Sequence, residues 1–232
     1  MKKNLVVLSG AGVSAESGLS TFRDAGGLWE GFDVMEVASV NGWRKNKNLV
    51  LDFYNQRRSQ LKNVKPNNAH LLIAELEKYF NVCVVTQNVD DLHERAGSSD
   101  IIHLHGKLTE AKSSLNQNLI YDIGYKDINI GDLAADGSQL RPNIVWFGEQ
   151  VPKITEAAEV ISEADIVIVI GTSLVVYPAA GLIEYASPVA QKYIIDPVKP
   201  TLNQNMSNLE YIEHKASKGM EHLFTRLLYD FT

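Results

Sequence analysis

Four short apolar runs, each followed at once by a small or polar turn, constrain the fold of this chain more than any other feature. They lie at residues 5–8, 82–85, 166–170 and 193–195. Every position within them is apolar, which is typical of strands covered on both faces. Segments with helical spacing of apolar residues separate them, at residues 47–62, 66–79, 156–163 and 220–228. Because buried strands that alternate with helices form parallel sheets with right-handed crossovers, we predict an α/β fold with a Rossmann-like, doubly wound parallel sheet.

A glycine-rich turn follows the first run and begins Ser9-Gly10-Ala11-Gly12. The two glycines allow a tight turn and a close approach of the backbone to a ligand. A helix that begins directly after such a turn points backbone N–H groups at an anion such as a phosphate. Ala15 stands at the third position of the dinucleotide-binding pattern, where alanine is an accepted variant. A tight turn without a ligand is the other interpretation.

Polar side chains also follow two later runs. Asn88 and Asp90 come after the second run, and Gly171, Thr172 and Ser173 come after the third, where a helix is expected to open within residues 174–180. Ligands of α/β proteins bind at the carboxyl ends of parallel strands. Asn88 and Asp90 could also cap a helix, and both roles can hold at once. The sequence thus predicts a nucleotide site at this edge of the sheet.

The run at residues 9–24, which includes Phe22-Arg23-Asp24, resembles the cofactor-binding signature of the sirtuins, the NAD-dependent protein-lysine deacylases. The resemblance recurs in four later segments and covers most of the chain. It implies that NAD is the cofactor, with Asp196 standing where the family more often has asparagine. The residues that the resemblance places around NAD are Gly10, Ala11, Gly12, Ala15, Phe22, Arg23, Trp29, Gln87, Asn88, Asp90, Gly171, Thr172, Ser173, Asp196 and Ala216.

His105 matches the histidine–glycine motif of the sirtuins, and the resemblance makes it the general base. An imidazole titrates near neutral pH, which suits the removal of a proton from a ribose hydroxyl. The resemblance also implies that Asn88 orders the ribose side and a water molecule, and that Asp90 meets the nicotinamide amide. These three residues are the expected catalytic group. Three further histidines are expected to be structural, namely His70, His93 and His103.

Tyr54 and Arg57 are three residues apart in an expected helix and therefore share a face. A phenol beside a guanidinium can bind a carboxylate, although a surface arginine beside a partly buried tyrosine has the same pattern. The pair matches the acyl pocket of the bacterial desuccinylase- and demalonylase-like sirtuins. The resemblance thus implies acyl-lysine proteins or peptides as substrates, with succinyl and malonyl groups favoured and acetyl groups accepted.

An extended segment at residues 145–148 resembles the part of sirtuins along which the substrate peptide lies. Strand addition of this kind uses main-chain hydrogen bonds and tolerates many peptide sequences. A core strand would show the same pattern of apolar residues. The expected peptide contacts are Val145, Phe147, Gly148 and Val175.

Residues 107–141 are rich in Ser, Asn, Asp and Gly and interrupt the alternation of strands and helices. Sirtuins usually carry here two Cys-x-x-Cys pairs that bind a structural zinc ion. Ser113, Asn116, Asp136 and Gly137 stand at or near those positions in this chain. Neutral Ser and Asn are poor zinc ligands, so we predict no metal. We expect an apolar core within the segment instead, made of Leu115, Leu119, Ile120, Tyr121, Ile123, Tyr125, Ile128, Ile130 and Leu133.

A length of 232 residues suits one large domain with insertions. We expect a Rossmann-like NAD-binding domain made of residues 1–25, 66–106 and 142–232. Residues 26–65 and 107–141 would form a small domain, with the ligand cleft between the two.

The charge and the apolar pattern exclude several partners. A net charge of −6 argues against nucleic acid. No apolar run is long enough to span a membrane, and the first residues have too little apolar sequence for a signal peptide. Cys83 is the only cysteine and cannot form an internal disulfide, so we expect a cytoplasmic protein.

Three other activities fit the same cofactor. A dehydrogenase would form NADH and release no nicotinamide. An NAD hydrolase or ADP-ribosyltransferase would release nicotinamide without an acyl-lysine. A non-catalytic NAD sensor would turn nothing over, and the combination of His105, Asn88 and Asp90 argues against it.

Overall fold

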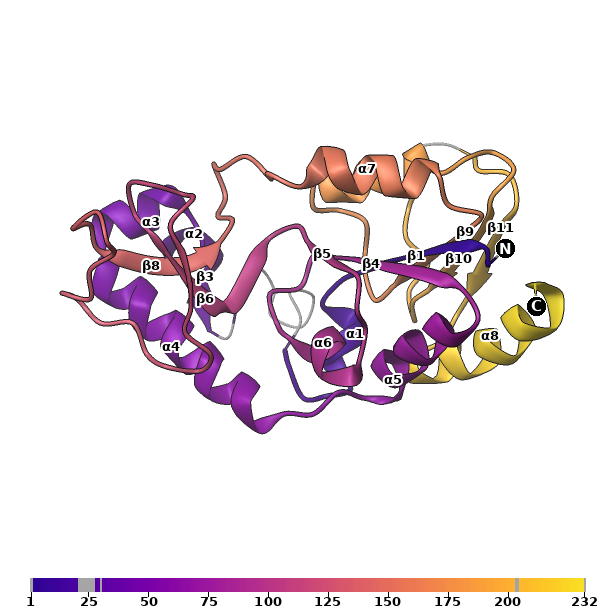
Figure 1. Cartoon of the computed structure of the whole chain (residues 1–232), viewed down its shortest axis with the longest axis horizontal. Helices are drawn as coiled ribbons and strands as arrows, with labels where there is room; N and C mark the ends of the chain where they lie inside the picture. Colours follow the sequence, from indigo (N-terminus) through magenta and orange to yellow (C-terminus); the bar gives the residue numbers. More distant parts are fainter. Residues whose placement is uncertain (1, 21–27, 30, 203–204, 232) are drawn as a thin grey trace.

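The computed structural model describes residues 2–20, 28–29, 31–202 and 205–231. Its centre is a six-stranded sheet in which all neighbouring strands are parallel (Figure 1). The order β11-β10-β9-β1-β4-β5 reads 3-2-1-4-5-6 from the far edge when these strands are numbered along the chain. This is the doubly wound order, so the predicted fold class is confirmed. The strands are β1 (Asn4–Ser9), β4 (Asn81–Thr86), β5 (Ile101–His103), β9 (Ile166–Ile170), β10 (Gln191–Ile195) and β11 (Leu209–Ile212).

Helices cover both faces of this sheet. Alternate residues of a strand point to opposite faces. Leu5 and Val7 pack with α5 (Asn68–Glu75) and α8 (Ala216–Phe231) on one face. Val6 and Leu8 pack with α7 (Ile154–Ser162) and η2 (Ala179–Tyr185) on the other. Burial on both sides explains why the strands are apolar at consecutive positions.

Two expected helices differ in form from the prediction. The helix expected at 66–79 is α5 followed by a 3-10 turn, η1 (Leu76–Lys78). The helix expected to open within 174–180 is η2, a 3-10 helix that begins only at Ala179. Its residues Ala179, Leu182 and Ile183 are buried against the sheet, so packing holds it in place. None of the helices in the described ranges has the length and apolar character needed to cross a membrane.

A second, three-stranded antiparallel sheet lies at the left of Figure 1. Its strands are β6 (Gly106–Ser113), β7 (Ile120–Asp122) and β8 (Leu140–Ile144). It packs on the long helix α4 (Lys47–Asn63), with Phe53 and Leu61 meeting Leu108, Ile128 and Ile144. Short elements complete this part of the chain, namely β2 (Leu28–Trp29), β3 (Phe32–Asp33), α2 (Val34–Val37) and α3 (Val40–Lys45).

The expectation that residues 107–141 have an apolar core of their own is wrong. Ile128 alone of the nine expected residues is fully buried, and it packs into the core shared with α4. Ile123 and Tyr125 are partly buried there, and Leu119 and Tyr121 have intermediate exposure. Four others are exposed, namely Leu115, Ile120, Ile130 and Leu133. A short sheet that leans on a helix buries one face only, and periodicity within the segment does not reveal the helix.

A cluster of hydrogen bonds stands where sirtuins usually bind zinc. The buried Ser113 hydroxyl donates to Asp136 Oδ2 (2.6 Å) and lies 2.8 Å from the Ser138 hydroxyl. It also accepts from the backbone N–H groups of Leu115 (3.0 Å) and Asn116 (2.8 Å). The described residues contain no group of three or more His, Cys, Asp or Glu able to hold a metal ion. The cluster ties the end of β6 to the turn before β8.

Candidate active site

The turn after β1 packs directly against the turn after β9, where the order of the sheet reverses. Gly10 N donates to Ile170 O (3.0 Å) and Gly12 N donates to Gly171 O (2.8 Å). A Cβ on Gly10 would lie 2.6 Å from the Thr172 Cβ, and one on Gly12 would lie 2.8 Å from the Gly171 Cα. We expected these glycines to admit a ligand. The structure shows a second reason for glycine at these positions: the two turns are in contact, and a side chain would clash between them.

Ser14, in the short helix α1 (Gly12–Ala15), joins the first turn to the residues after β4. Its hydroxyl donates to Asp90 Oδ2 (2.9 Å) and accepts from Asn88 Nδ2 (3.1 Å). All three side chains are buried. In the sequence, Ser14 is only one hydroxyl within the glycine-rich run and is not distinguished from its neighbours. Two expected catalytic residues are thus held by one serine.

Two hydrogen bonds to the backbone hold the segment after β4. Asn88 N donates to Thr86 Oγ1 (3.0 Å), and Asp90 Oδ1 accepts from Leu92 N (3.1 Å) at the start of α6 (Leu92–Ala96). Burial raises the pKa of the Asp90 carboxyl to about 6, although the hydrogen bonds from Leu92 and Ser14 oppose the shift. Asp90 can therefore change its charge near neutral pH and also contributes to a helix start, as both sequence interpretations allowed.

His105 lies between β5 and β6, beside the same segment. Its Nδ1 is 2.9 Å from the carbonyl oxygen of Gln87. Burial holds the pKa of the imidazole below its usual range, while the hydrogen bond to Gln87 opposes the shift. His105 is therefore neutral at pH 7. A neutral imidazole whose Nδ1–H donates to a carbonyl leaves Nε2 with a lone pair, as a general base requires.

Gln87 connects the histidine to the turn after β9. Its Nε2 donates to Thr172 Oγ1 (3.1 Å), and Thr172 is itself buried. The three strand ends after β1, β4 and β9 thereby form one hydrogen-bonded group that includes His105. The structure brings these predicted residues together, as the sequence analysis required.

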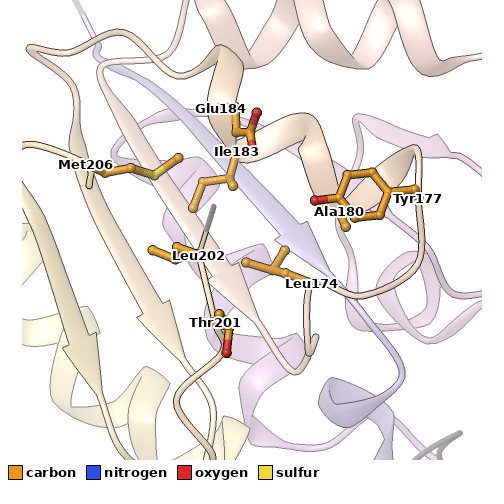
Figure 2. A pocket seen from close by; sticks show the side chains of 8 residues that line it. All are labelled: Leu174, Tyr177, Ala180, Ile183, Glu184, Thr201, Leu202 and Met206. Atoms are coloured by element: carbon orange, nitrogen blue, oxygen red, sulfur yellow. The ribbon is translucent and has the colours of Figure 1, made fainter. Parts of the chain in front are cut away.

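The two residues after Ser173 differ in exposure. Leu174, at φ 54°, is buried, whereas Val175 is 70% exposed. Figure 2 shows the small hollow into which Leu174, Ile183, Leu202 and Met206 point. The described residues that line this hollow include none of the predicted site residues. Glu184, Thr201 and Tyr177 also line it, and Val175, an expected peptide contact, is not part of it.

Asp196 and Ala216 lie at the carboxyl edge of β10 and at the start of α8. Asp196 is buried, and its Oδ1 accepts from Val198 N (2.9 Å). This hydrogen bond to the second residue along the chain is typical of a turn-forming aspartate. Asp196 thus has a structural role besides the cofactor contact that the resemblance implies.

His70 and His93 occupy the interior behind Ser9 and Ser14. His70 Nδ1 accepts from Asn67 N (3.3 Å) in a capping box at the start of α5, and burial lowers its pKa to about 4. His93 Nε2 lies 2.9 Å from the Ser9 hydroxyl, and burial lowers its pKa well below the usual value. Both rings are therefore neutral, and their contacts agree with the expected structural role.

Tyr54 and Arg57 both lie on α4, but their surroundings differ. Tyr54 is fully buried and its hydroxyl accepts from Trp146 Nε1 (3.0 Å). Burial raises the pKa of this phenol, which keeps it neutral. The Arg57 Cζ lies 5.5 Å from the Phe53 ring centroid, and the Trp29 ring packs edge-on against the same phenylalanine at 5.0 Å. Trp146 lies within the expected peptide segment 145–148, although the sequence does not single it out as a contact.

Arg141 and Glu149 hold that peptide segment in place. Arg141 donates to both Glu149 carboxylate oxygens (2.7 and 3.0 Å), and its Cζ lies 3.4 Å from the Trp146 ring centroid. The segment itself extends past the end of β8. Val145 N donates to His105 O (2.9 Å) and Phe147 N to Ala38 O (2.9 Å).

The segment is exposed at Phe147 and Gly148, whereas Trp146 within it is buried. Phe147 is 43% exposed, and Gly148 has a φ of 91°, which favours glycine. Direct backbone contact between Val145 and His105 places the expected peptide segment beside the expected base.

The expected cofactor residues Phe22 and Arg23 lie outside the described residues.

Comparisons with known proteins agree with these observations. The model of the Sir2 family matches residues 10–178. The "NAD-dependent protein deacylase" of Helicobacter pylori strain J99 is 57% identical over 226 residues, which cover 97% of this chain and 96% of that protein. The protein of the same name from Bacteroides thetaiotaomicron is 54% identical over 95% of this chain and 96% of its own length.

Solved structures show the same likeness. A Sir2 homologue in complex with NAD superposes with a TM-score of 0.85 at 37% identity, over 99% of this chain and 91% of that one. Sir2 in complex with an inhibitor, 2′-O-acetyl-ADP-ribose and a deacetylated p53 peptide superposes with a TM-score of 0.75 at 28% identity, over 96% and 93%. The chain therefore belongs to the Sir2 family.

Proposed function

We propose that this chain is an NAD-dependent protein-lysine deacylase that removes malonyl and succinyl groups in addition to acetyl groups. Its relatives at 54–57% identity are NAD-dependent protein deacylases, which supports the reaction class. The single observation that carries the proposal is the hydrogen-bonded group of His105, Gln87 and Thr172 at the reversal point of the sheet. A nucleotide bound there would lie beside a neutral histidine.

The donors and acceptors at this edge suit NAD. The turn at Gly171–Ser173 offers the hydroxyl groups of Thr172 and Ser173, and Asp90 offers a buried carboxyl group to the carboxamide. NAD bound there would supply an electrophilic ribose carbon: the acyl oxygen of the substrate would displace nicotinamide, and one water molecule would be consumed as the lysine amine is released and the acyl group passes to ADP-ribose. The residues that we propose around NAD are Gly10, Ala11, Gly12, Ala15, Phe22, Arg23, Trp29, Gln87, Asn88, Asp90, Gly171, Thr172, Ser173, Asp196 and Ala216.

The chain's own residues have distinct parts in this reaction. His105 accepts a proton from a ribose hydroxyl at its free Nε2, because Nδ1 is engaged by Gln87. Asn88 orders the ribose side, and Ser14 fixes the position of its amide. Asp90 binds the carboxamide, and its raised pKa allows it to carry a proton as a donor.

Acyl selection is assigned to Tyr54 and Arg57. The arginine offers a planar set of donors for the distal carboxylate, and the tyrosine hydroxyl is already oriented by Trp146. The substrate peptide would lie along residues 145–148 and meet Val175. In the proposed two-part organisation, Tyr54 and Arg57 belong to the small domain (residues 26–65 and 107–141).

Product analysis tests this function. Mass spectrometry of the products from NAD with acetyl-, malonyl- and succinyl-lysine peptides should show nicotinamide, free lysine and O-acyl-ADP-ribose. The His105→Ala variant should not form the acylated product. Nicotinamide release without any peptide would indicate an NAD hydrolase or ADP-ribosyltransferase, and NADH formation would indicate a dehydrogenase. Either result would contradict the proposal.

A further inference from the structure

His103, the last residue of β5, contacts the backbone of the segment after β4 that contains Asn88 and Asp90. Its Nδ1 lies 3.3 Å from the carbonyl oxygen of Asn88, and its Nε2 lies 2.7 Å from Glu94 Oε1 on α6. The His103 side chain is 9% exposed and the Glu94 side chain is 34% exposed. His103 and His105 therefore contact the carbonyls of two consecutive residues, Asn88 and Gln87.

The chemistry of these contacts relates their number to the proton content of the ring. A carbonyl and a carboxylate are both acceptors, and a neutral imidazole has one N–H only. Both contacts of His103 can be hydrogen bonds only when the ring carries a proton on each nitrogen. Burial raises the pKa of Glu94, but the hydrogen bond and charge of His103 outweigh it and the pKa lies below its usual range. Two hydrogen bonds to these acceptors would require an imidazolium beside a carboxylate.

The surrounding charges agree with this arrangement. Lys107 Nζ lies 4.0 Å from Glu94 Oε1 and 3.0 Å from Glu110 Oε1, so the lysine is shared between two carboxylates. An imidazolium at this place is therefore surrounded by more negative than positive groups.

We propose that His103, held as an imidazolium by Glu94, is a positioning residue that fixes the backbone carbonyl of Asn88. The proposal rests on the proposed function, because its effect is on the reaction at Asn88. Fixing this carbonyl fixes the plane of the peptide that joins Asn88 to Val89, directly after the Gln87–Asn88 peptide whose carbonyl contacts His105. The His105 imidazole and the Asn88 side-chain amide are thereby held in a fixed position relative to each other. His105 contacts the Gln87 carbonyl, and Ser14 contacts the Asn88 side chain. From the sequence alone, His103 is expected to have only a structural role.

Nitrogen-15 NMR of the histidine side chains tests the charge without any need for activity. In the wild-type protein at pH 7, His103 should show two protonated ring nitrogens. In Glu94→Gln it should become a neutral ring with the proton on Nδ1, because the amide can donate to Nε2. A neutral His103 ring in the wild type would overturn the proposal, whatever the enzyme's reaction is.

Kinetics test the positioning role. His103→Leu removes both contacts and should lower kcat about 10- to 100-fold, the scale expected when a catalytic group is displaced, with little change in the KM of the peptide. Glu94→Gln should lower kcat less, and it should have no further effect in the His103→Leu background because it acts through His103. Unchanged kcat in folded His103→Leu, or additive effects, would overturn the proposal.

A matched control separates this positioning role from the general effect of holding a loop in place. Glu77 accepts from Ser99 N (2.7 Å) and from the Ser99 hydroxyl (2.8 Å), so it also holds the chain that enters β5, but it does not contact Asn88. Glu77→Gln should keep the wild-type kcat. An equal loss in Glu77→Gln and Glu94→Gln would assign the effect to the loop and overturn the proposal. An inactive wild-type protein with an imidazolium at His103 would contradict the proposed function alone.

Discussion

The Nδ1 atom of the His105 imidazole lies 2.9 Å from the backbone carbonyl oxygen of Gln87. A carbonyl oxygen only accepts, so Nδ1 carries the hydrogen and the neutral ring presents Nε2 as the basic atom. Gln87 also donates to Thr172 on the neighbouring turn. The base is therefore oriented by Gln87, the residue that links the carboxyl ends of strands β4 and β9.

His105→Ala should lower kcat for acyl transfer by about 100- to 10,000-fold, the range for a lost general base. Nicotinamide leaves before the base acts in the proposed sequence. Exchange of labelled nicotinamide into NAD, with an acyl peptide present, should therefore persist in the variant. Loss of exchange and product formation together, in a protein with the wild-type melting temperature, would place His105 in the earlier step.

The pH dependence of kcat/KM should have its acid limb below pH 6.5. Burial lowers the pKa of His105, so the neutral, basic form persists to a lower pH than that of a free imidazole. Activity should fall as the pH decreases through the lowered pKa. Asp90 titrates in the same region, with a pKa of about 6. The profile of Asp90→Asn separates the two groups, because a limb that belongs to His105 survives this substitution.

Ser14→Ala should weaken both the site and the fold. The substitution leaves Asp90 Oδ2 and Asn88 Nδ2 buried without this partner, at a cost of about 1–3 kcal/mol in the free energy of unfolding. NAD binding should also weaken, which calorimetry measures beside urea unfolding. Ser162→Ala is the matched control, since this exposed hydroxyl bonds only to the Glu159 carbonyl of its own helix region. Equal unfolding curves for Ser14→Ala and the wild type would contradict the role of Ser14.

Much of this arrangement could be predicted because it depends on local sequence. The strands covered on both faces are apolar throughout, and the residues at their ends are polar. Asn88, Asp90 and Thr172 were therefore found from position alone. Their convergence then follows from the rule that parallel strands share one carboxyl edge.

Other features depend on contacts between distant segments and left no local signal. Ser14 is one hydroxyl among several in its run, and only its distance to Asp90 reveals its function. Trp146 fits a core strand as well as a polar partner for Tyr54. The exposure of Leu115 and Leu133 follows from the packing of residues 107–141 against α4, a helix far away in the chain.

Trp146→Phe should change acyl preference more than overall activity. The phenylalanine keeps an aromatic ring beside Arg141 but removes the N–H that donates to the Tyr54 hydroxyl. We expect malonyl- and succinyl-peptide activity to fall about tenfold, as for one lost hydrogen bond of about 1.5 kcal/mol, with acetyl-peptide activity nearly unchanged. Tyr54→Phe and Arg57→Met should show the same selective loss. Equal losses on acetyl and succinyl peptides would contradict the carboxylate role of the pair.

Stability of the segment at 107–141 should depend on Ser113 and not on a metal ion. The Ser113 hydroxyl holds four partners across 25 residues of sequence, and replacing it with alanine should lower the free energy of unfolding by about 1–3 kcal/mol. A chelator should leave the melting temperature and the deacylase activity unchanged, because serine and aspartate oxygens in this cluster are engaged with hydrogen-bond donors. Thermal unfolding of the wild type and of Ser113→Ala, each with and without the chelator, measures both effects. Ser114→Ala is the neighbouring control, since none of these bonds involves its side chain. A chelator-dependent fall in the melting temperature would show that this segment binds a metal after all.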